Sequence, residues 1–288
     1  MAKLEHQVPD LEIREACEAL GISRSGYYAH RKKPHRPRRV EDAALGEEIC
    51  TVFAASRSSY GSPRMMHALR RKGLRLGKSR IARLMREGGC RVARKRRFIP
   101  RTTVSSPDHP VAPNRLLENP VPSRPDKVWV TDITYIPTGE GWLYLAAEMD
   151  LCSRRIVGWS TSANLGTGLP QHALDRALSA RPGAIQSGLL HHSDRGCQYT
   201  SASFRRGLQM RGIQSSMSRK GNCYDNAAME SFWATLKTEC FGKQFAATRA
   251  AARGMIFDYI ETFYNPLRLH SALGFQSPVE YEQSLTSN

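Results

Sequence analysis

Three apolar stretches between residues 127 and 161 constrain the fold more than any other feature of this chain. They cover residues 127–137, 142–150 and 154–161, and they are separated only by the turns Gly139-Glu-Gly141 and Leu151-Cys-Ser153. Runs of this length bounded by turn residues are typical of strands, and turns this short connect antiparallel neighbours. We therefore expect two successive antiparallel hairpins at the start of a folded core.

The residues that follow alternate between helical and strand patterns. Helices are expected over about 168–180 and 201–211, strands over 188–193 and 213–217, and a last helix around Glu230. Strands connected through helices at this spacing usually pair in parallel. The predicted order βββαβαβα therefore describes an α/β fold with a mixed sheet flanked by helices.

Three carboxylates occupy notable places in this pattern. Asp132 lies in the first strand, Asp194 ends the apolar run Leu-Leu-His-His-Ser-Asp, and Glu230 lies in the helical stretch Asn-Ala-Ala-Met-Glu-Ser-Phe-Trp. Carboxylate oxygens suit Mg²⁺ or Mn²⁺, and two such ions can activate a hydroxyl and stabilise the leaving oxygen of a phosphodiester. Taken singly, each acid is more often a surface or capping residue, and 35 residues between Asp194 and Glu230 is a common spacing.

The positive charge of the chain is concentrated near its start. The formal net charge is +17, and residues 1–101 hold 25 Lys and Arg against 10 Asp and Glu. The remaining residues hold 18 against 16, so they are close to neutral. A one-sided basic excess favours a nucleic-acid-binding N-terminal region attached to a near-neutral domain.

Residues 41–98 have the pattern of three helices with basic outer positions. The first has an apolar stripe that includes Leu45 and Ile49, and Gly88-Gly89 ends the third. We expect a helical, helix-turn-helix-like DNA-binding unit whose charges contact phosphates. The candidate contact residues are Arg64, Arg70, Lys78, Arg80 and Arg83.

These patterns divide the chain into five segments. Residues 1–40 hold a helix ending near Gly21, a second helix and a basic linker, which suits a helix-turn-helix segment or an ordinary helical hairpin equally. The other expected segments are a helical DNA-binding domain at 41–100, a Pro- and Ser-rich linker at 101–126, a catalytic core at 127–245, and a C-terminal helix and tail at 246–288.

Several classes of protein are disfavoured. No stretch approaches 18 uninterrupted apolar residues and the N-terminus has no apolar signal stretch, so we expect a cytoplasmic protein with no membrane partner. The seven cysteines are widely spaced without a CxxC pair, which indicates reduced thiols and no zinc site.

Several long motifs, in order, resemble one known family. The chain resembles the second-frame (OrfB) product of insertion-sequence transposases of the IS-three type, within the DDE transposase and retroviral integrase superfamily. The matching stretches are Thr-Asp-Ile-Thr-Tyr-Ile (131–136), Gly-Trp-Leu-Tyr-Leu (141–145), His-Ser-Asp-Arg-Gly-Cys-Gln-Tyr-Thr-Ser (192–201), Ser-Met-Ser-Arg-Lys-Gly-Asn-Cys-Tyr-Asp-Asn-Ala (216–227), Met-Glu-Ser-Phe-Trp (229–233), Leu-Lys-Thr-Glu (236–239) and Tyr-Asn-Pro-Leu-Arg-Leu-His-Ser-Ala-Leu (264–273).

The resemblance implies an RNase H-like core and roles for single residues. Asp132, Asp194 and Glu230 would be the catalytic, metal-binding triad for two Mg²⁺ or Mn²⁺ ions. Lys237, two helical turns after Glu230, would hold a DNA phosphate near the metals. Arg195 and Asn226 would orient the triad or contact DNA, although plain loop and surface roles suit them equally.

The activity implied is that of a polynucleotidyl transferase. The enzyme would cut the ends of an insertion sequence and join the freed 3′-hydroxyl to a second phosphodiester. The implied partners are double-stranded DNA, an upstream-frame (OrfA-type) protein or fusion, and further copies of the chain, in a bacterial cytoplasm beside the nucleoid. The alternatives are a non-catalytic DNA-binding regulator of the fused transposase and an RNase H-like nuclease.

Two acids near the predicted site are expected to serve other purposes. Asp150 ends a strand before the tight turn to Ser153, which favours turn capping. Glu239 lies nine positions after Glu230, about half a turn around the helix, and should face away from the triad.

Overall fold

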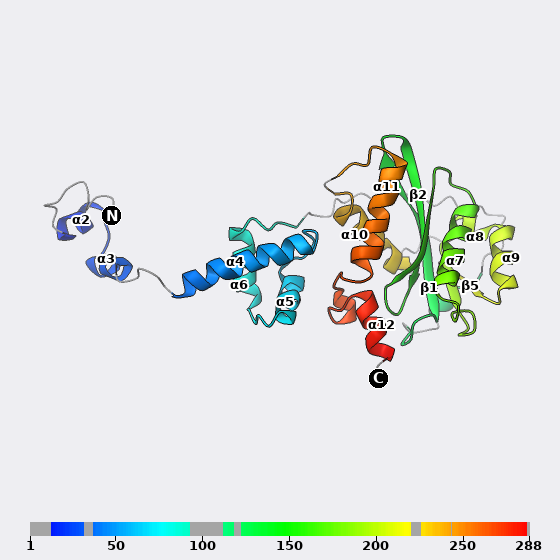
Figure 1. The fold of residues 1–288 in the computed structure, drawn as a ribbon, viewed down its shortest axis with the longest axis horizontal. Helices are drawn as coiled ribbons and strands as arrows, with labels where there is room; N and C mark the ends of the chain where they lie inside the picture. The colour runs from blue at the N-terminus through cyan, green and yellow to red at the C-terminus, as the bar shows by residue number, and fades with distance from the viewer. Residues whose placement is uncertain are drawn as a thin grey trace.

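The computed structural model describes residues 13–31, 37–92, 112–117, 122–219, 226–242 and 244–286. At its centre is a five-stranded mixed sheet with the order β3-β2-β1-β4-β5 (Figure 1). The strands are β1 (Val128–Thr138), β2 (Gly141–Asp150), β3 (Ile156–Ser162), β4 (Leu190–Ser193) and β5 (Gln214–Met217). The β1–β2 and β2–β3 pairs are antiparallel, whereas β4 pairs in parallel with both β1 and β5. The predicted mixed α/β sheet is confirmed.

Helices cover both faces of this sheet (Figure 1). One side holds α7 (Gly168–Ala180), α8 (Cys197–Thr200) and α9 (Ala202–Met210), and the other holds α10 (Ala227–Glu239) and α11 (Arg249–Phe257), which continues as a π-helical segment, η3 (Asp258–Tyr264). Successive residues of a strand face opposite sides, so Trp129 packs in the cluster with α7 and α9 while Val130 packs in the cluster with α10 and α11. Asp132 is two residues from Val130, so its side chain lies on the same face of the sheet, toward α10.

The N-terminal part is helical, as predicted. A first pair, α2 (Ile13–Ala19) and α3 (Arg24–Arg31), is joined through Gly21, whose φ of 62° is the left-handed conformation that ends a helix. A three-helix unit follows, which we call the helical unit. It consists of α4 (Pro37–Ala55), α5 (Ser62–Arg71) and α6 (Lys78–Glu87).

The helical unit is packed onto the sheet domain. Buried side chains of both parts, such as Met65 and Met229, belong to one continuous apolar cluster. The hydroxyl of Tyr60 donates to the carbonyl of Leu267 at 3.1 Å and accepts from the amide of Leu269 at 2.9 Å. The guanidinium of Arg57 lies 2.6 Å from the Asp258 carboxylate. These contacts fix the helical unit to the segment around η3.

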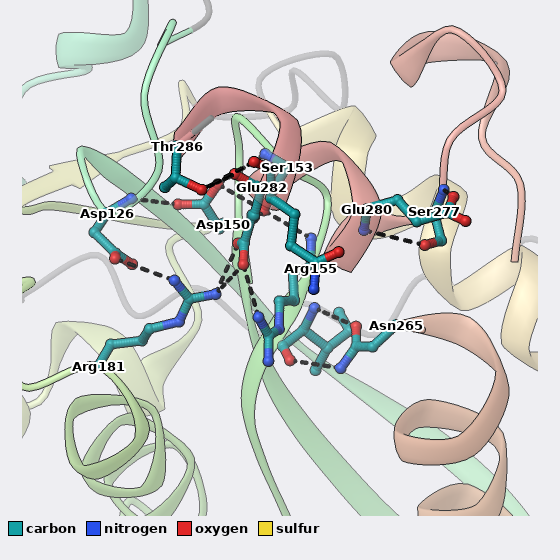
Figure 2. A network of polar contacts seen from close by, with 12 residues as sticks. Asp126, Asp150, Ser153, Arg155, Arg181, Asn265, Ser277, Glu280, Glu282 and Thr286 are labelled. Carbon is teal, nitrogen blue, oxygen red and sulfur yellow. Dashed lines mark hydrogen bonds and ion pairs between the residues drawn. The ribbon is translucent and has the colours of Figure 1, made fainter. Parts of the chain in front are cut away.

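A buried polar network attaches the C-terminal helix α12 (Pro278–Thr286) to the sheet domain (Figure 2). The Glu282 carboxylate accepts from Ser153 at 2.8 Å, from Arg155 at 2.7 Å and from Arg181 at 2.6 Å. Asp150 accepts from the backbone amides of Ser153 and Asp126 at 2.8 and 2.7 Å. The network thus joins α12 to the β2–β3 turn, to the segment before β1 and to the end of α7.

Some predicted features lie outside the described residues. These are residues 93–100 at the end of the predicted DNA-binding domain, residues 32–36 of the basic linker, and residues 101–111 and 118–121 of the Pro- and Ser-rich linker. Two short 3-10 turns, η1 (Arg115–Leu117) and η4 (Ser271–Leu273), complete the described elements. Among the helices within the described ranges, none is both long and apolar enough to cross a membrane.

Candidate active site

Asp132 and Asp194 come together because their strands are adjacent and parallel. The register of this parallel pair matches Val130 of β1 with His192 of β4, and Asp132 and Asp194 lie two residues beyond them, Asp194 directly after the end of β4. Equal offsets in a parallel pair place the two carboxylates side by side on the same face. The amide of Gly196 donates to Asp194 Oδ1 at 2.9 Å and holds this carboxylate at the end of β4.

Helix α10 lies across β1 and contacts it at both ends of its first two turns. At its start, Asn226 Nδ2 donates to the carbonyl of Thr131 at 3.0 Å. Two turns on, the indole N–H of Trp233 donates to Asp132 Oδ2 at 2.9 Å. Glu230 lies between these anchors, one turn before Trp233, on the exposed side of the helix.

The electrostatics of Asp132 show that negative charge is concentrated here. The pKa of Asp132 is raised from 3.8 to about 7, mainly by burial, with a further contribution from the neighbouring Asp194 and a smaller one from the Glu230 charge. The amide of Ile133 and the indole of Trp233 act in the opposite direction by hydrogen bonding to the carboxylate. Burial also raises the pKa of Glu230. Carboxylates that hinder one another's ionisation are a favourable environment for a cation.

The three acids do not form a closed cage in this structure. Among the described residues, no three His, Cys, Asp or Glu side chains lie close enough together to hold a metal ion. The paired carboxylates of Asp132 and Asp194 are nevertheless hard oxygen donors of the kind that Mg²⁺ and Mn²⁺ prefer. The donor chemistry therefore fits such an ion, with Glu230 approaching from α10.

Lys237 and Arg195, two further residues predicted to belong to the site, have defined surroundings in the structure. Burial lowers the pKa of Lys237, while the charge of Asp132 acts to raise it, so this ammonium lies within electrostatic reach of the aspartate. The Nε of Arg195 donates to the carbonyl of Ser218 at 2.7 Å and not to one of the acids. Its charge therefore lies beside the end of β5.

The candidate DNA contacts of the helical unit differ in their surroundings. Arg70 and Lys78 are exposed. Arg80 and Arg83 both bind Asp42 at 2.6 Å, which fastens α6 to α4. Arg64 is half-buried at the junction with the sheet domain.

The two acids predicted to serve other purposes do so. Asp150 caps the turn to Ser153, as expected. Glu239 faces away from the triad and binds Arg268 at 2.7 Å, and it also accepts from the Tyr259 hydroxyl at 2.8 Å. Both predictions are confirmed.

Trp233 is a neighbour of Asp132 to which the sequence analysis assigned no role. Trp233 belongs to the quoted Met-Glu-Ser-Phe-Trp motif, yet only the structure shows its N–H on Asp132. Its spacing could have indicated that it lies near the site, because a residue three positions after Glu230 lies on nearly the same side of a helix. An indole there could only be matched to Asp132 once the packing of α10 on β1 was known.

Comparisons with known proteins agree with this arrangement. Two models described as "Integrase core domain" match residues 122–223 and 211–278, and a model described as "HTH-like domain" matches residues 39–98. The "Insertion element IS600 uncharacterized 31 kDa protein" of Shigella sonnei is 43% identical over 93% of this chain and 97% of that protein. The "Transposase InsF for insertion sequence IS3A" of Escherichia coli (strain K12) is 36% identical over 97% of this chain and 96% of that protein.

The chain belongs to the insertion-sequence transposases of the IS3 type. The predicted resemblance is confirmed, and the family's integrase core makes this transposase a polynucleotidyl transferase. Among solved structures, a simian T-cell lymphotropic virus intasome chain matches with a TM-score of 0.47 and 13% identity, over 75% of this chain and 70% of that one. The sequence relatives carry the assignment.

Proposed function

We propose that this transposase cuts and joins DNA at the ends of its insertion sequence, using Asp132, Asp194 and Glu230 to hold two Mg²⁺ or Mn²⁺ ions. The observation that carries the proposal is the alignment of Asp132 on β1 with Asp194 at the end of the adjacent parallel strand β4, beneath the helix that bears Glu230. When bound, such ions supply an activated water or hydroxyl nucleophile and stabilise the leaving oxygen.

The protein's own groups prepare this site. The indole of Trp233 and the amide of Ile133 each hold one oxygen of Asp132, so its carboxylate has a fixed orientation. Asn226 fixes the start of α10 and hence the height of Glu230 above the sheet. Lys237 provides a cation for a DNA phosphate near the acids, since its ammonium lies within reach of the Asp132 charge.

The partners of the reaction follow from the same assignment. We propose double-stranded DNA as substrate and target, several copies of the chain on that DNA, an upstream-frame protein or fusion, and a place beside the bacterial nucleoid. Arg195 and the basic side chains of the helical unit are proposed DNA contacts. The domain boundaries expected from the sequence, at residues 40, 100, 126 and 245, stay predictions.

A strand-transfer assay tests this function. The purified chain, alone and fused to its upstream frame, is incubated with labelled element-end DNA, target DNA and Mg²⁺. Joined product supports the transposase reaction. Intact DNA binding without any cleavage or joining by either protein would favour the regulator, and cleavage of an RNA·DNA hybrid without joining would favour a nuclease.

Replacing Trp233 with Phe should weaken metal binding. The ring is retained, but the N–H that holds Asp132 Oδ2 is lost, and groups that orient a metal ligand are commonly worth about 10- to 100-fold in metal affinity. We expect the Mg²⁺ concentration for half-maximal strand transfer to rise about tenfold. The matched control is Trp159→Phe, which removes an indole N–H bonded to Glu261 at 2.8 Å and should leave the Mg²⁺ dependence unchanged.

The raised pKa of Asp132 predicts a pH-dependent effect on stability. Its folded pKa of about 7 lies above the ordinary 3.8, so it contributes stability below about pH 4 that is lost as the pH rises through 7. In metal-free protein, Asp132→Asn should therefore raise the melting temperature at pH 8 and have a smaller effect at pH 5. Adding Mg²⁺ at pH 8 should narrow the difference. An equal effect at both pH values would contradict the assignment.

A further inference from the structure

A cavity of about 460 Å³ lies between the helical unit and the sheet domain, and we call it the junction cavity. Its volume is within the range of about 300–1,000 Å³ typical of ligand sites. Its walls come from the start of α5, from the β2–β3 turn and from the tail after η3. The face of α10 that bears Ser231 and Thr235, away from Glu230, forms a further wall. The charged and imidazole groups that line it are Arg57, Arg64, Arg154, Glu239, Arg268 and His270.

Part of this charge is balanced within the protein. Arg268 donates to both oxygens of Glu239 at 2.7 Å, and both side chains are almost completely buried. Arg57 is paired with Asp258. These two arginines and their acids therefore neutralise each other in pairs.

Arg64 and Arg154 are not balanced in this way. Neither guanidinium forms an ion pair or a side-chain hydrogen bond with any residue of the described ranges, although both are half-buried. Burial and the nearby Arg268 both lower the pKa of Arg64, which shows that its charge is held in an unfavourable place. A half-buried cation without a partner costs stability, so an anion that enters the cavity would be bound favourably.

Two further observations concern the same cavity. Arg154 has a φ of 60°, a left-handed conformation in which glycine or asparagine is far more usual. The β2–β3 turn thus carries a long cationic side chain at a position where the backbone conformation favours glycine. In the same cavity, the buried Nε2 of His270 has no hydrogen-bond partner within the described part of the chain.

We propose that the junction cavity binds a phosphodiester group of DNA between Arg64 of the helical unit and Arg154 of the β2–β3 turn. Guanidinium groups suit phosphate because they offer paired N–H donors and a permanent charge. This site presupposes the proposed action on DNA and lies apart from the triad, on the other side of α10. One phosphate there would connect the DNA-binding helices to the helix that bears Glu230.

Phosphate neutralisation tests the proposal directly. A labelled element-end duplex is prepared in versions that each carry one uncharged methylphosphonate, and binding to the full chain is measured by fluorescence anisotropy in EDTA. For the wild type we expect one position at which neutralisation weakens binding about tenfold, as for loss of a charged hydrogen bond. At that position, Arg64→Gln and Arg154→Gln should each bind the neutral and charged duplexes within about twofold of each other.

Controls separate this site from general electrostatics and from catalysis. Arg206→Gln removes an exposed arginine of α9 away from the cavity and should keep the wild-type sensitivity at every position. Asp194→Asn should also keep it, so a failure of the catalytic assignment would not affect this result. Melting curves of each variant confirm folding before binding is compared.

Two outcomes would overturn the proposal. One is that both glutamine variants keep the wild-type sensitivity at every methylphosphonate position. The other is that inorganic phosphate raises the melting temperature of the wild type but not of Arg154→Gln, while no DNA position is coupled to either arginine. In that case the cavity binds a free anion rather than a DNA strand.

Discussion

Replacing Asp194 with Asn is expected to lower strand transfer by about 10³-fold, because metal-assisted stabilisation worth several kcal/mol is lost. The amide is nearly the same size as the carboxylate and can still accept from the Gly196 amide, so the turn after β4 should be preserved. Removing one of two adjacent negative charges should also lower the pKa of Asp132, since Asp194 is one of the groups that raise it.

The measurement combines joining, binding and folding. Joined product is quantified in Mg²⁺ for the wild type and for Asp194→Asn, and affinity for the same duplex is measured beside it. The matched control is Asp175→Asn, since Asp175 lies on α7 and binds Arg211 at 2.8 Å, away from β1 and β4. Strand transfer by Asp194→Asn at the wild-type rate would remove Asp194 from the site.

Replacing Glu282 with Gln is expected to lower the free energy of unfolding by about 3 kcal/mol, the lower end of the cost of breaking a buried ion pair. Its carboxylate is the shared acceptor for Arg155 and Arg181 and also binds Ser153 (Figure 2). The amide would leave Arg155 without its counter-charge and Arg181 with only the longer contact to Asp126 at 3.3 Å, and Arg181 is mostly buried. Denaturant unfolding monitored by circular dichroism gives the value.

Glu280 on the same helix provides the comparison. Its pair with Arg71 has an N–O distance of 2.7 Å, similar to those of Glu282, but both side chains are about 40% exposed. Glu280→Gln keeps the acceptor for the Ser277 amide and loses only a solvent-screened charge pair, so the cost should be about 1 kcal/mol or less. Equal losses for the two variants would show that the Glu282 network does not hold α12 in place.

Local patterns in the sequence were enough to predict the sheet and to find Asp132 and Asp194. The strands have long apolar runs and short turns, and the acids end or interrupt such runs, so neighbouring residues carry the information. The orientation of Arg64 could not be predicted in the same way. On an isolated helix it lies among basic residues that face solvent, and only the packing of the helical unit on the sheet domain turns it toward the junction.

The same limit applies to the other contacts that the sequence did not reveal. The bond from Trp233 to Asp132 spans 101 residues, and the bonds from Glu282 to Arg155 and Arg181 span 127 and 101. Contacts between such distant residues depend on how helices pack on the sheet, which no local periodicity specifies. The proposed DDE roles could be assigned before the fold was known only because several motifs resemble a known family.

The attachment of the helical unit through Tyr60 and Arg57 has a consequence for the DNA of the element. If the helical unit binds the duplex and is fixed on the domain that cleaves it, the number of base pairs between the bound segment and the cleaved phosphodiester is fixed as well. Adding one base pair there turns the scissile bond by roughly 35° about the duplex axis, given 10–10.5 base pairs per turn. On that condition, the ends of the element would be constrained in helical phase as well as in sequence.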